Sequence, residues 1–493
     1  MHLPDWLPSI PSWPWLAIYA VDLLLRIALG VHVIMRRRPV AVSLAWLAVL
    51  LALPFLSIFI YLLVGETHLG IRRAKRHERQ TKQLEEKAVH IWKHRHLDTE
   101  AIGEEFGQIA RYGTAVSGMP PLRGNRLTLL PDNESMLAAL ERDIDGATSH
   151  CHLLYYIYLN DTAGTAIGDA LLRAAKRGVA CRLLVDGVGS RAFLKSDLHT
   201  RLTAGGVQVV EALPVNLFRR PFARVDLRNH RKIAVIDGRV AYCGSQNITD
   251  THFRSHKWRK TGQWIDATVR VDGPAAQALA VTFLRDWQLD SDEDMSDVAG
   301  FLPEPLPHED HECVVQVVPS GPGPTPEAIH QAVLTLIYSA REELIMTTPY
   351  FVPDQATLEA LRAAAARGVD VTLVMPRVSD SPLVAAASRS HYLDLLETGV
   401  RIHHYEGGLL HAKAMTIDRK VGLIGSTNFD QRSFFLNFEV TLFIYDDNFA
   451  SVLRFMQMGY LNNAEEVELH EWRRRGWLES LRDNAAQLLG PLL

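Results

Sequence analysis

Two long apolar runs open the chain, and the remainder alternates short apolar segments with polar ones. The run from Val40 to Gly65 contains no charged residue. As a helix, its 26 residues would extend about 39 Å, which exceeds the roughly 30 Å hydrocarbon core of a bilayer. The pattern predicts a membrane anchor at residues 1–68, a transmembrane hairpin whose helices cover about 13–35 and 40–65.

The first apolar run differs from the second because it carries charge. It extends from Trp13 to Met35 and contains Asp22 and Arg26. A lone charge near the bilayer centre costs about 3 kcal/mol, although residues four apart on a helix can pair. We therefore expect the run at 40–65 to be the spanning helix, and the first to be a weaker span or a tilted interfacial helix.

A cleaved signal peptide is the alternative for this N-terminal segment. Met1 to Pro14 has no basic region, and no small-residue cleavage site follows the apolar run, so we expect a retained anchor. Basic clusters flank the second run, namely Arg36, Arg37 and Arg38 before it and Arg72, Arg73, Lys75, Arg76, Arg79 and Lys82 after it. If both runs span, the larger cluster favours cytoplasmic lobes, whereas if only one spans, both clusters can share one face.

Beyond a charged connector at 69–126, the same order of apolar strands and alanine-rich helices occurs twice. Strands at 153–159 and 343–348 precede helices at 166–177 and 356–367, each closed by Arg-Gly-Val. Further strands follow at 182–185 and 371–375. This alternation predicts an α/β fold with two similar lobes, at 127–300 and 326–493, whose mixed β-sheets are flanked by helices. A Pro/Gly-rich linker at 301–325 separates them, and the second lobe ends in a C-terminal helix.

A polar motif recurs once in each predicted lobe. His230-x-Lys232-x-x-x-x-Asp237, followed by Gly244-Ser245-x-Asn247, returns 181 residues later with every internal spacing preserved. The second copy consists of His411, Lys413, Asp418, Gly425, Ser426 and Asn428. Residues i and i+2 of a strand face the same way, so each histidine is expected to share a face with its lysine. Two copies predict one active site that the lobes share.

The residue types of this motif suit phosphodiester chemistry. Lys232 and Lys413, helped by the amides of Asn247 and Asn428, can neutralise and hold the phosphate. One histidine then attacks phosphorus as neutral imidazole, while the other donates a proton to the leaving alkoxide. This scheme requires no metal and no cofactor.

Carboxylates outside the motif are the candidates for orienting the histidines, since a carboxylate on the second ring nitrogen fixes the tautomer. Asp266 and Glu439 lie downstream of the first and second motif copies. Asp237 and Asp418 belong to the catalytic signature by position, but they follow the lysines by five residues at a turn. We expect these two to act through the structure.

The composition excludes several classes of protein. The chain of 493 residues has 47% hydrophobic and 22% charged residues with a net charge of -4, which is globular usage without attraction to polyanions, so we expect no nucleic-acid partner. Its four cysteines contain no C-x-x-C pair, which argues against a zinc ribbon or a disulfide framework. A catalytically silent scaffold that binds anionic lipid is the remaining non-enzymatic alternative.

The paired motifs resemble the phospholipase D superfamily, and further segments resemble its membrane-anchored bacterial cardiolipin synthases. These segments include Thr348-Pro-Tyr-Phe-Val-Pro-Asp354 and Leu436-Asn-Phe-Glu439. The resemblance implies two phospholipase D-like lobes in a multi-pass protein of the bacterial inner membrane. It also implies transfer of a phosphatidyl group between two phosphatidylglycerol molecules, with His230 as nucleophile and His411 as acid/base. A hydrolase, or a transferase to another alcohol, is the alternative, and a homo-oligomer is left open.

Overall fold

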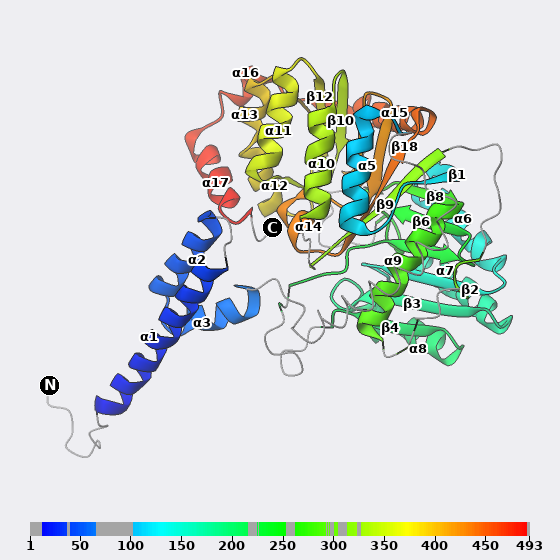
Figure 1. Cartoon of the computed structure of the whole chain (residues 1–493), viewed down its shortest axis with the longest axis horizontal. Helices are drawn as coiled ribbons and strands as arrows, with labels where there is room; N and C mark the ends of the chain where they lie inside the picture. The colour runs from blue at the N-terminus through cyan, green and yellow to red at the C-terminus, as the bar shows by residue number, and fades with distance from the viewer. Residues whose placement is uncertain are drawn as a thin grey trace. The chain divides into compact units, whose positions relative to one another are not determined.

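The computed structural model describes residues 12–36, 40–65, 102–214, 224, 226–252, 262–291, 293, 295, 300–303, 313–322 and 327–490 (Figure 1). These form two compact units. The first comprises Met1–Ala74 with Asn216–Asp226, and the second comprises Lys75–Val215 with Leu227–Leu493. The basic cluster at 72–82 lies outside the described residues. Each unit is described by itself.

The N-terminal unit reverses the expected ranking of the two apolar runs. Helix α1 (Ser12–Met35) is continuous, and among the described residues it is the one helix long and apolar enough to cross a bilayer. The second run is broken into α2 (Val40–Ala52), α3 (Leu56–Ile60) and a π-helical turn (Tyr61–Gly65). Pro54 causes the break, because proline has no N–H and its ring clashes with the carbonyl four residues earlier. The prediction of one helix across 40–65 is therefore wrong.

Asp22 and Arg26 form hydrogen bonds with backbone groups at this break. Arg26 Nε donates to Asp22 Oδ2 at 2.8 Å, the i,i+4 pair that their spacing allows. Arg26 Nη1 also donates to the carbonyl of Leu50 at 3.2 Å, which is the carbonyl that Pro54 leaves without its helical donor. Asp22 Oδ1 accepts from the backbone N–H of Phe55 at 2.9 Å. The charges that weaken the first run as a span thus satisfy the backbone of the second.

The second unit is built on one mixed sheet that contains fifteen of the described strands. In spatial order it runs β19-β13-β12-β10-β15-β16-β18-β9-β1-β8-β6-β5-β2-β3-β4. The strands are β1 (Leu122–Leu130), β2 (His150–Tyr155), β3 (Ala180–Asp186), β4 (Gln208–Ala212), β5 (Ile233–Ile236), β6 (Val240–Gly244), β8 (Thr268–Asp272), β9 (Cys313–Ser320), β10 (Glu343–Thr347), β12 (Asp370–Pro376), β13 (Arg401–Tyr405), β15 (Ala414–Ile417), β16 (Val421–Gly425), β18 (Glu439–Tyr445) and β19 (Ala464–Glu466). Two short pairs accompany it, β11 (Phe351–Val352) with β17 (Phe429–Asp430), and β7 (Trp264–Ile265) with β14 (Leu409–Leu410).

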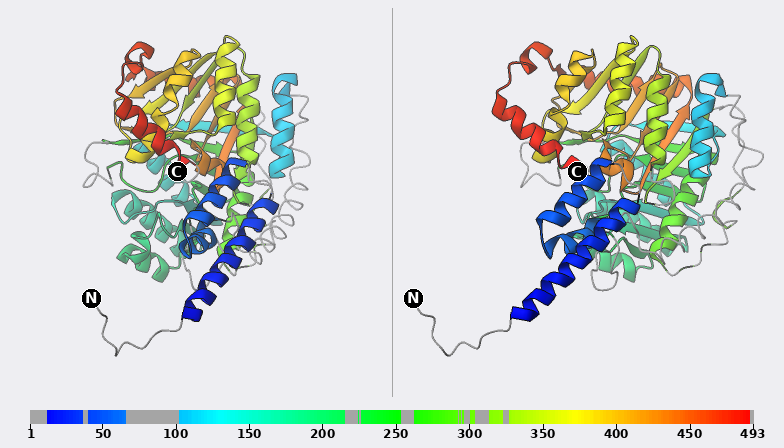
Figure 2. Two further views of the ribbon diagram at one scale, coloured as in Figure 1. Left: turned by 90° about the vertical axis from the view of Figure 1, so that its left-hand side faces the viewer. Right: turned by 60° about the vertical axis from the view of Figure 1, so that its left-hand side comes forward.

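Helices cover both halves of this sheet. They are α5 (Glu104–Ser117), α6 (Asn133–Asp145), α7 (Thr162–Lys176), a 3₁₀ turn (Phe193–Lys195), α8 (Asp197–Ala204), α9 (Pro274–Asp290), α10 (Ala328–Ser339), α11 (Gln355–Ala366), α12 (Pro382–Arg389), α13 (Tyr392–Glu397), α14 (Gln431–Phe435), α15 (Asp447–Leu461), α16 (Leu469–Trp472) and α17 (Trp477–Gln487). Figures 1 and 2 show α5, α10 and α11 side by side along the second half of the sheet.

The strand order has the two-fold symmetry that the repeated motif predicts. From the outside inward, the first half runs β4-β3-β2-β5-β6-β8-β1, and the second runs β13-β12-β10-β15-β16-β18-β9 with β19 added at its edge. The halves meet where β1 pairs with β9 antiparallel. The helices expected at 166–177 and 356–367 are α7 and α11, and the glycines after them, Gly178 and Gly368, have φ of +88° and +91°. That left-handed conformation suits glycine because it lacks a Cβ.

Two expected connecting segments are in fact core elements of the second half. The segment at 301–325 contains β9, whose residues are mostly buried between β1 and β18. The connector at 69–126 contains α5, whose Phe106 and Ile109 pack in one cluster with Ile329 and Val333 of α10. The density of proline and glycine predicts loops at 301–325, but it does not reveal that the short apolar stretch within this segment forms a strand.

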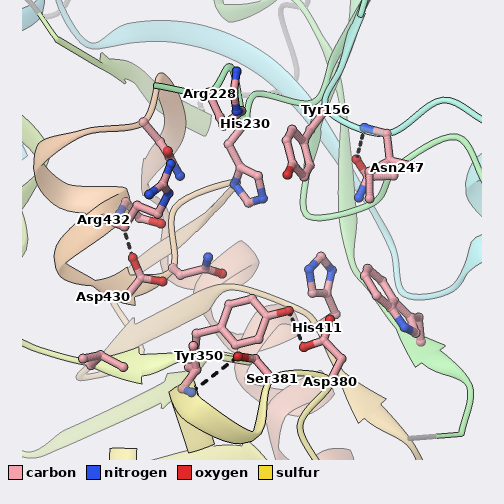
Figure 3. Close-up of a pocket in the computed structure, with 17 residues that line it drawn as sticks. Tyr156, Arg228, His230, Asn247, Tyr350, Asp380, Ser381, His411, Asp430 and Arg432 are labelled. Carbon is pink, nitrogen blue, oxygen red and sulfur yellow. Dashed lines mark hydrogen bonds between the residues drawn. The ribbon is translucent and has the colours of Figure 1, made fainter. Parts of the chain in front are cut away.

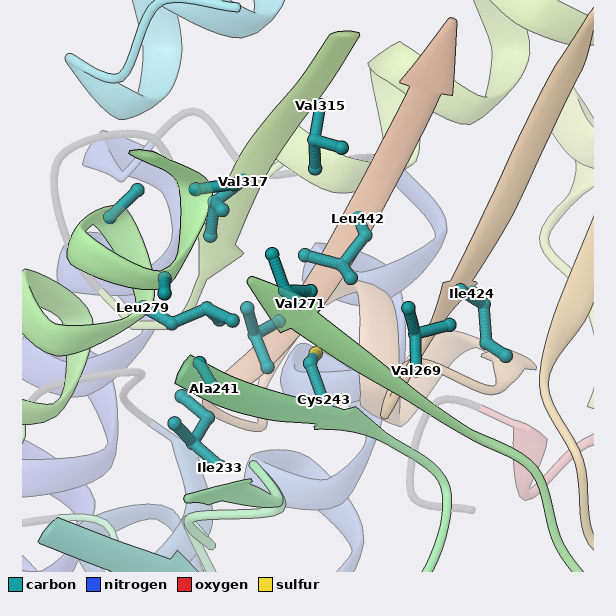
Figure 4. Packing of buried hydrophobic residues seen from close by; sticks show 14 of the residues in the cluster. Ile233, Ala241, Cys243, Val269, Val271, Leu279, Val315, Val317, Ile424 and Leu442 are labelled. Carbon is teal, nitrogen blue, oxygen red and sulfur yellow. The ribbon is translucent and has the colours of Figure 1, made fainter. Parts of the chain in front are cut away.

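The largest core cluster joins both halves across the seam (Figure 4). It brings Val269 and Val271 of β8 together with Val317 of β9 and Leu442 of β18. Nearly every residue of α9 is buried within this region, from Pro274 to Gln288. Each methylene buried in such a core contributes about 0.8 kcal/mol, so the seam holds the two half-sites in a fixed relation.

Candidate active site

One cavity of about 410 Å³ collects side chains from both halves of the sheet. His230 and His411 face each other across it (Figure 3). The lining residues are Tyr156, Ile157, Arg228, His230, Asn247, Trp264, Tyr350, Val352, Asp380, Ser381, Val384, His411, Asn428, Asp430, Arg432, Ser433 and Asn437. The structure thus brings the histidines and asparagines of both motif copies to one site.

Each histidine is held by a carboxylate from the other half. His230 Nδ1 lies 2.9 Å from Glu439 Oε1, and His411 Nδ1 lies 2.6 Å from Asp266 Oδ1. Sequence reasoning selects both carboxylates, but it associates each with the motif upstream of it. In the fold the pairs cross.

Backbone pairing between the halves produces this crossing. The N–H of His230 donates to the carbonyl of Phe438 at 2.9 Å, and that of His411 donates to Ile265 at 2.7 Å. Phe438 and Ile265 directly precede the two carboxylates in the sequence. Parallel pairing of β7 with β14 and a bridge between Asn229 and Phe438 fix the same registers. Each histidine is therefore positioned by the strand that delivers its partner.

The environment favours neutral imidazoles beside ionised carboxylates. Burial lowers the pKa of His230 to about 4 and that of His411 to about 3. Burial alone would raise the pKa of Asp266, but its contacts with His411, Lys413 and Ser245 outweigh that effect and hold it at about 2. An ionised carboxylate can only accept, so Nδ1 carries the hydrogen and Nε2 presents its lone pair. Both rings are thereby prepared as nucleophile or base.

The motif lysines are close to the histidines but do not line the cavity. Lys232 Nζ donates to the backbone carbonyl of His230 at 2.5 Å, and Lys413 Nζ donates to that of His411 at 2.6 Å. Burial lowers the pKa of Lys232 to about 8 and that of Lys413 to about 7. Each ammonium acts electrostatically on the histidines of both halves.

The asparagines and serines of the repeat have separate tasks. Asn247 Oδ1 accepts from the N–H of Ile157 at 3.0 Å, which leaves its Nδ2 as the donor for the cavity. Asn428 lines the cavity, and its buried Oδ1 has no hydrogen-bond partner among the described residues. Ser245 donates to Asp266 at 2.6 Å and Ser426 donates to Glu439 at 2.5 Å. Both serines belong to the repeated motif, but their hydrogen bonds to the carboxylates are not predicted from the sequence.

The signature aspartates hold backbone and are absent from the cavity lining. Asp237 accepts from the N–H groups of Thr148, Ser149 and His150 at 2.8 Å each. Asp418 accepts in the same way from residues 341–343 at 2.8–2.9 Å. Both have a positive φ, 52° and 50°, at the turn after the motif strand. These contacts support the prediction that both aspartates act through the structure, and that role stays a prediction.

The cavity also contains residues that sequence reasoning misses. Tyr350 donates to Asp380 Oδ1 at 2.7 Å, and its ring centroid lies 6.4 Å from that of His411. Figure 3 shows Tyr350, Asp380 and Ser381 on the His411 side, and Arg228 on the His230 side. Asp380 follows the carboxyl end of β12, directly before helix α12. Its position at the carboxyl end of a parallel strand is the signal that could have identified it.

Among the described residues, no group of three or more histidine, cysteine, aspartate or glutamate side chains is arranged to hold a metal ion.

Comparison with known proteins finds sequence relatives among the cardiolipin synthases. The family model described as cardiolipin synthase, PLD-like domain, matches residues 140–287 and 333–456, and the phospholipase D-nuclease N-terminal model matches 24–66. Cardiolipin synthase A of Proteus mirabilis is 38% identical over 97% of this chain and 98% of its own length. That of Yersinia pseudotuberculosis is also 38% identical, over 97% and 98%. The crystal structure of phosphatidylserine synthase from Haemophilus influenzae, at 14% identity and a TM-score of 0.59, shares the fold over 78% of this chain and 100% of its own.

Proposed function

The chain belongs to the cardiolipin synthase family of the phospholipase D superfamily, and from this premise we propose that it transfers a phosphatidyl group from one phosphatidylglycerol to a hydroxyl of another. The products are cardiolipin and glycerol. One observation carries the proposal, namely two buried imidazoles that face a common cavity, each fixed through Nδ1 by a carboxylate of the opposite half.

The first half of the reaction forms a bond between nitrogen and phosphorus. His230 Nε2 attacks the phosphorus of the donor lipid, and the bond to the glycerol oxygen breaks. His411, protonated once the anionic phosphate lies beside it, gives its Nε2 proton to that oxygen. The result is a phosphatidyl-histidine, free glycerol and a neutral His411.

The second half reverses the roles of proton and phosphate. A hydroxyl of the second phosphatidylglycerol gives its proton to His411 while its oxygen attacks the phosphorus. The bond to His230 Nε2 breaks, and both histidines return to their starting states. Water in place of the second lipid would give phosphatidic acid, so the outcome depends on which alcohol the cavity retains.

The surroundings of the two histidines support this assignment of roles. The leaving and incoming alcohol must lie beside the acid/base and opposite the nucleophile. Hydroxyl and carboxylate groups suited to an alcohol, those of Tyr350, Asp380 and Ser381, lie on the His411 side (Figure 3). A carboxylate there would repel the phosphate, which favours placing the phosphorus nearer His230.

Lysines and asparagines complete the phosphate site in this proposal. Asn247 Nδ2 faces the cavity as a neutral donor. Lys232 and Lys413 supply positive potential from beneath the histidines, where burial strengthens their effect on the developing charge. Each ammonium donates to a histidine carbonyl in this structure, and it can act on the phosphate through its charge without direct contact.

Membrane association follows from the family and from helix α1. We propose further that the lobes lie on the cytoplasmic side of a bacterial inner membrane, supported by the basic cluster at 72–82. Reporter enzymes fused after residue 493 would test on which side of the membrane the lobes lie. A reporter that is active only in the periplasm would contradict the cytoplasmic placement.

Product analysis tests the function directly. The full chain, reconstituted in vesicles of phosphatidylglycerol, is expected to form cardiolipin and release equal amounts of glycerol, both measured by mass spectrometry. Phosphatidic acid as the sole product would reject transfer in favour of hydrolysis. A phosphate adduct on His230 that disappears in His230→Ala would support the covalent step, and substantial turnover in His411→Ala would contradict a shared site.

A further inference from the structure

Helix α17 (Trp477–Gln487) turns its apolar side outward. Trp477 is 72% exposed, Leu481 is 57% exposed and Leu488, directly after the helix, is 82% exposed. Leu478 and Leu489 are exposed as well. At 100° per residue these five side chains fall within one stripe about 120° wide. An amphipathic helix on a globular protein normally buries this stripe.

The inner side of α17 is polar and is fixed to the protein. Asp483 is fully buried and accepts from Arg389 of α12 at 2.9 and 3.1 Å. Arg475 and Arg482 also donate to Asp483. The buried Asp483 carboxylate must stay paired with these arginines, so it determines which side of the helix faces the protein, and the outward stripe is a consequence of this anchoring.

The anchoring places α17 against the wall of the active-site cavity. Helix α12, on which it packs, begins at the cavity-lining Ser381 and carries Val384, which also lines it. Ala486 of α17 packs in one cluster with Val352, another cavity residue. Figures 1 and 2 show α17 on the outer side of α12 in each view. Leu383, next to Val384, is also exposed.

We infer that α17 is a membrane-docking helix that seats the mouth of the cavity on the bilayer surface; this rests on the proposed function. A phosphatidylglycerol keeps its acyl chains in the bilayer while its phosphate reaches the histidines, so the cavity must open at the interface. A helix with leucines and a tryptophan on one face and arginines beside them, here Arg474 and Arg482, is the form that lies in such an interface. We therefore expect lipid to contact the apolar side of α17.

A fluorescent label tests the contact in the full chain. We would place NBD on Leu481→Cys, within the stripe, and on Gln487→Cys, an exposed position outside it. In vesicles that contain phosphatidylglycerol, lipids with a doxyl group on the acyl chain are expected to quench the label at 481 and to leave that at 487 unaffected. The unsubstituted chain controls for the native cysteines, three of which are buried.

Two substitutions test the consequence for catalysis. Leu481→Asp with Leu488→Asp is expected to lower cardiolipin formation from vesicles about tenfold, because the two substitutions remove apolar area from the stripe and anionic lipid repels the added carboxylates. With short-chain phosphatidylglycerol below its micellar concentration, the same double variant is expected to match the unsubstituted chain. Gln487→Asp is the matched control and should behave normally with both substrates.

Other results would overturn the inference. A label at 481 that doxyl lipids do not quench would mean that the stripe faces water, the N-terminal unit or a second copy of the chain. Equal loss with vesicles and with short-chain lipid would mean that the substitutions damage the fold. If the unsubstituted chain makes no cardiolipin, the proposed function fails, but the quenching result still decides whether α17 contacts lipid.

Discussion

At the scale of single residues, the contacts of Nδ1 decide what Nε2 can do. An ionised Glu439 accepts the Nδ1 hydrogen of His230, so the lone pair faces the cavity. Glu439→Gln offers an amide that can donate to Nδ1 instead, which moves the hydrogen to Nε2 and blocks attack. We expect kcat for cardiolipin formation to fall about 10²–10⁴-fold with little change in KM, as for other carboxylate-histidine pairs.

The matched control for this substitution is Glu293→Gln, which alters a carboxylate paired with Arg182 away from the cavity lining. Its kcat should stay normal. Asp266→Asn should repeat the defect of Glu439→Gln through His411. Normal turnover in either cavity variant would show that the carboxylates are dispensable for orienting the rings.

The buried lysines predict a decline of activity at alkaline pH. Burial lowers the pKa of Lys413 to about 7 and that of Lys232 to about 8, so each ammonium loses its proton as the pH rises through these values. Above them the positive potential at the phosphate is lost. We expect kcat/KM, which reports on the free enzyme, to fall between pH 7 and pH 9. A profile that stays level to pH 9 would mean that the lysines remain charged.

The repeat makes the histidines, lysines and asparagines candidate site residues because each type occurs twice at the same spacing. It does not predict that His230 pairs with the carboxylate of the second half and His411 with that of the first. Which half supplies Asp266 or Glu439 depends on the pairing of β7 with β14 and of Asn229 with Phe438, contacts between residues far apart in the chain. Asp380 is missed for a related reason, since a lone carboxylate in a loop has no repeated partner to identify it.

At the scale of elements, local signals predict the helices and strands of the repeat well and the breaks poorly. Glycine ends α7 and α11 as expected, because the residue after each helix needs a positive φ. The apolar run at 40–65 reads as one helix since composition cannot tell a kink from a stop at Pro54. The structure shows a stop because side chains of α1 take over the backbone groups at the break.

Removing that support should destabilise the N-terminal unit. In Asp22→Ala, the N–H of Phe55 loses its acceptor and Arg26 loses its carboxylate in a segment suited to hydrocarbon, where each unsatisfied group costs several kcal/mol. We expect less folded chain in the membrane fraction and a lower melting temperature in detergent. Asp22→Asn, which keeps an oxygen for Phe55, should lose less. Equal behaviour of the two variants would contradict this account of the break.

At the scale of the whole molecule, we expect the two halves of the sheet to fold and unfold together, because they share one core cluster and one sheet. The sequence predicts two lobes with mixed sheets but not how the sheets join, which happens at β1 and β9, whose pairing connects the halves at their inner edges. Those strands lie at the outskirts of the recognisable repeat. Their apolar pattern is consistent with a strand but contains no information about the partner.

Buried histidines throughout the second unit, which contains the active-site cavity, predict instability in acid. Burial lowers the pKa of His150, His391 and His404 to about 4, as it does that of His230, whereas the unfolded value is near 6.5. Between these values the unfolded chain binds more protons, so stability falls as the pH is lowered from about 6.5 towards 4. Asp430, whose pKa burial raises to about 6, acts in the opposite direction. Because four histidines oppose this one aspartate, we expect the net stability to fall as the pH is lowered.

Thermal melts in detergent should therefore show a lower midpoint at pH 5 than at pH 7.5. His391→Asn, which removes one titrating ring, should reduce the slope between these two values. A midpoint that is unchanged or higher at pH 5 would mean that these imidazoles stay accessible to protons in the folded state.

The crossed carboxylates also bear on how such a chain can arise and change. A free-standing half would lack a partner for its own imidazole and would have to assemble with a second copy of itself, each copy supplying the other. Fusion of two such halves makes the exchange internal and releases them from being identical. The strand registers place Tyr350 where the first half has Ile157, so the dyad with Asp380 exists beside one histidine and not beside the other. A symmetric ancestor would have treated both ends of a phosphodiester alike, whereas the two ends of this cavity differ in their side chains.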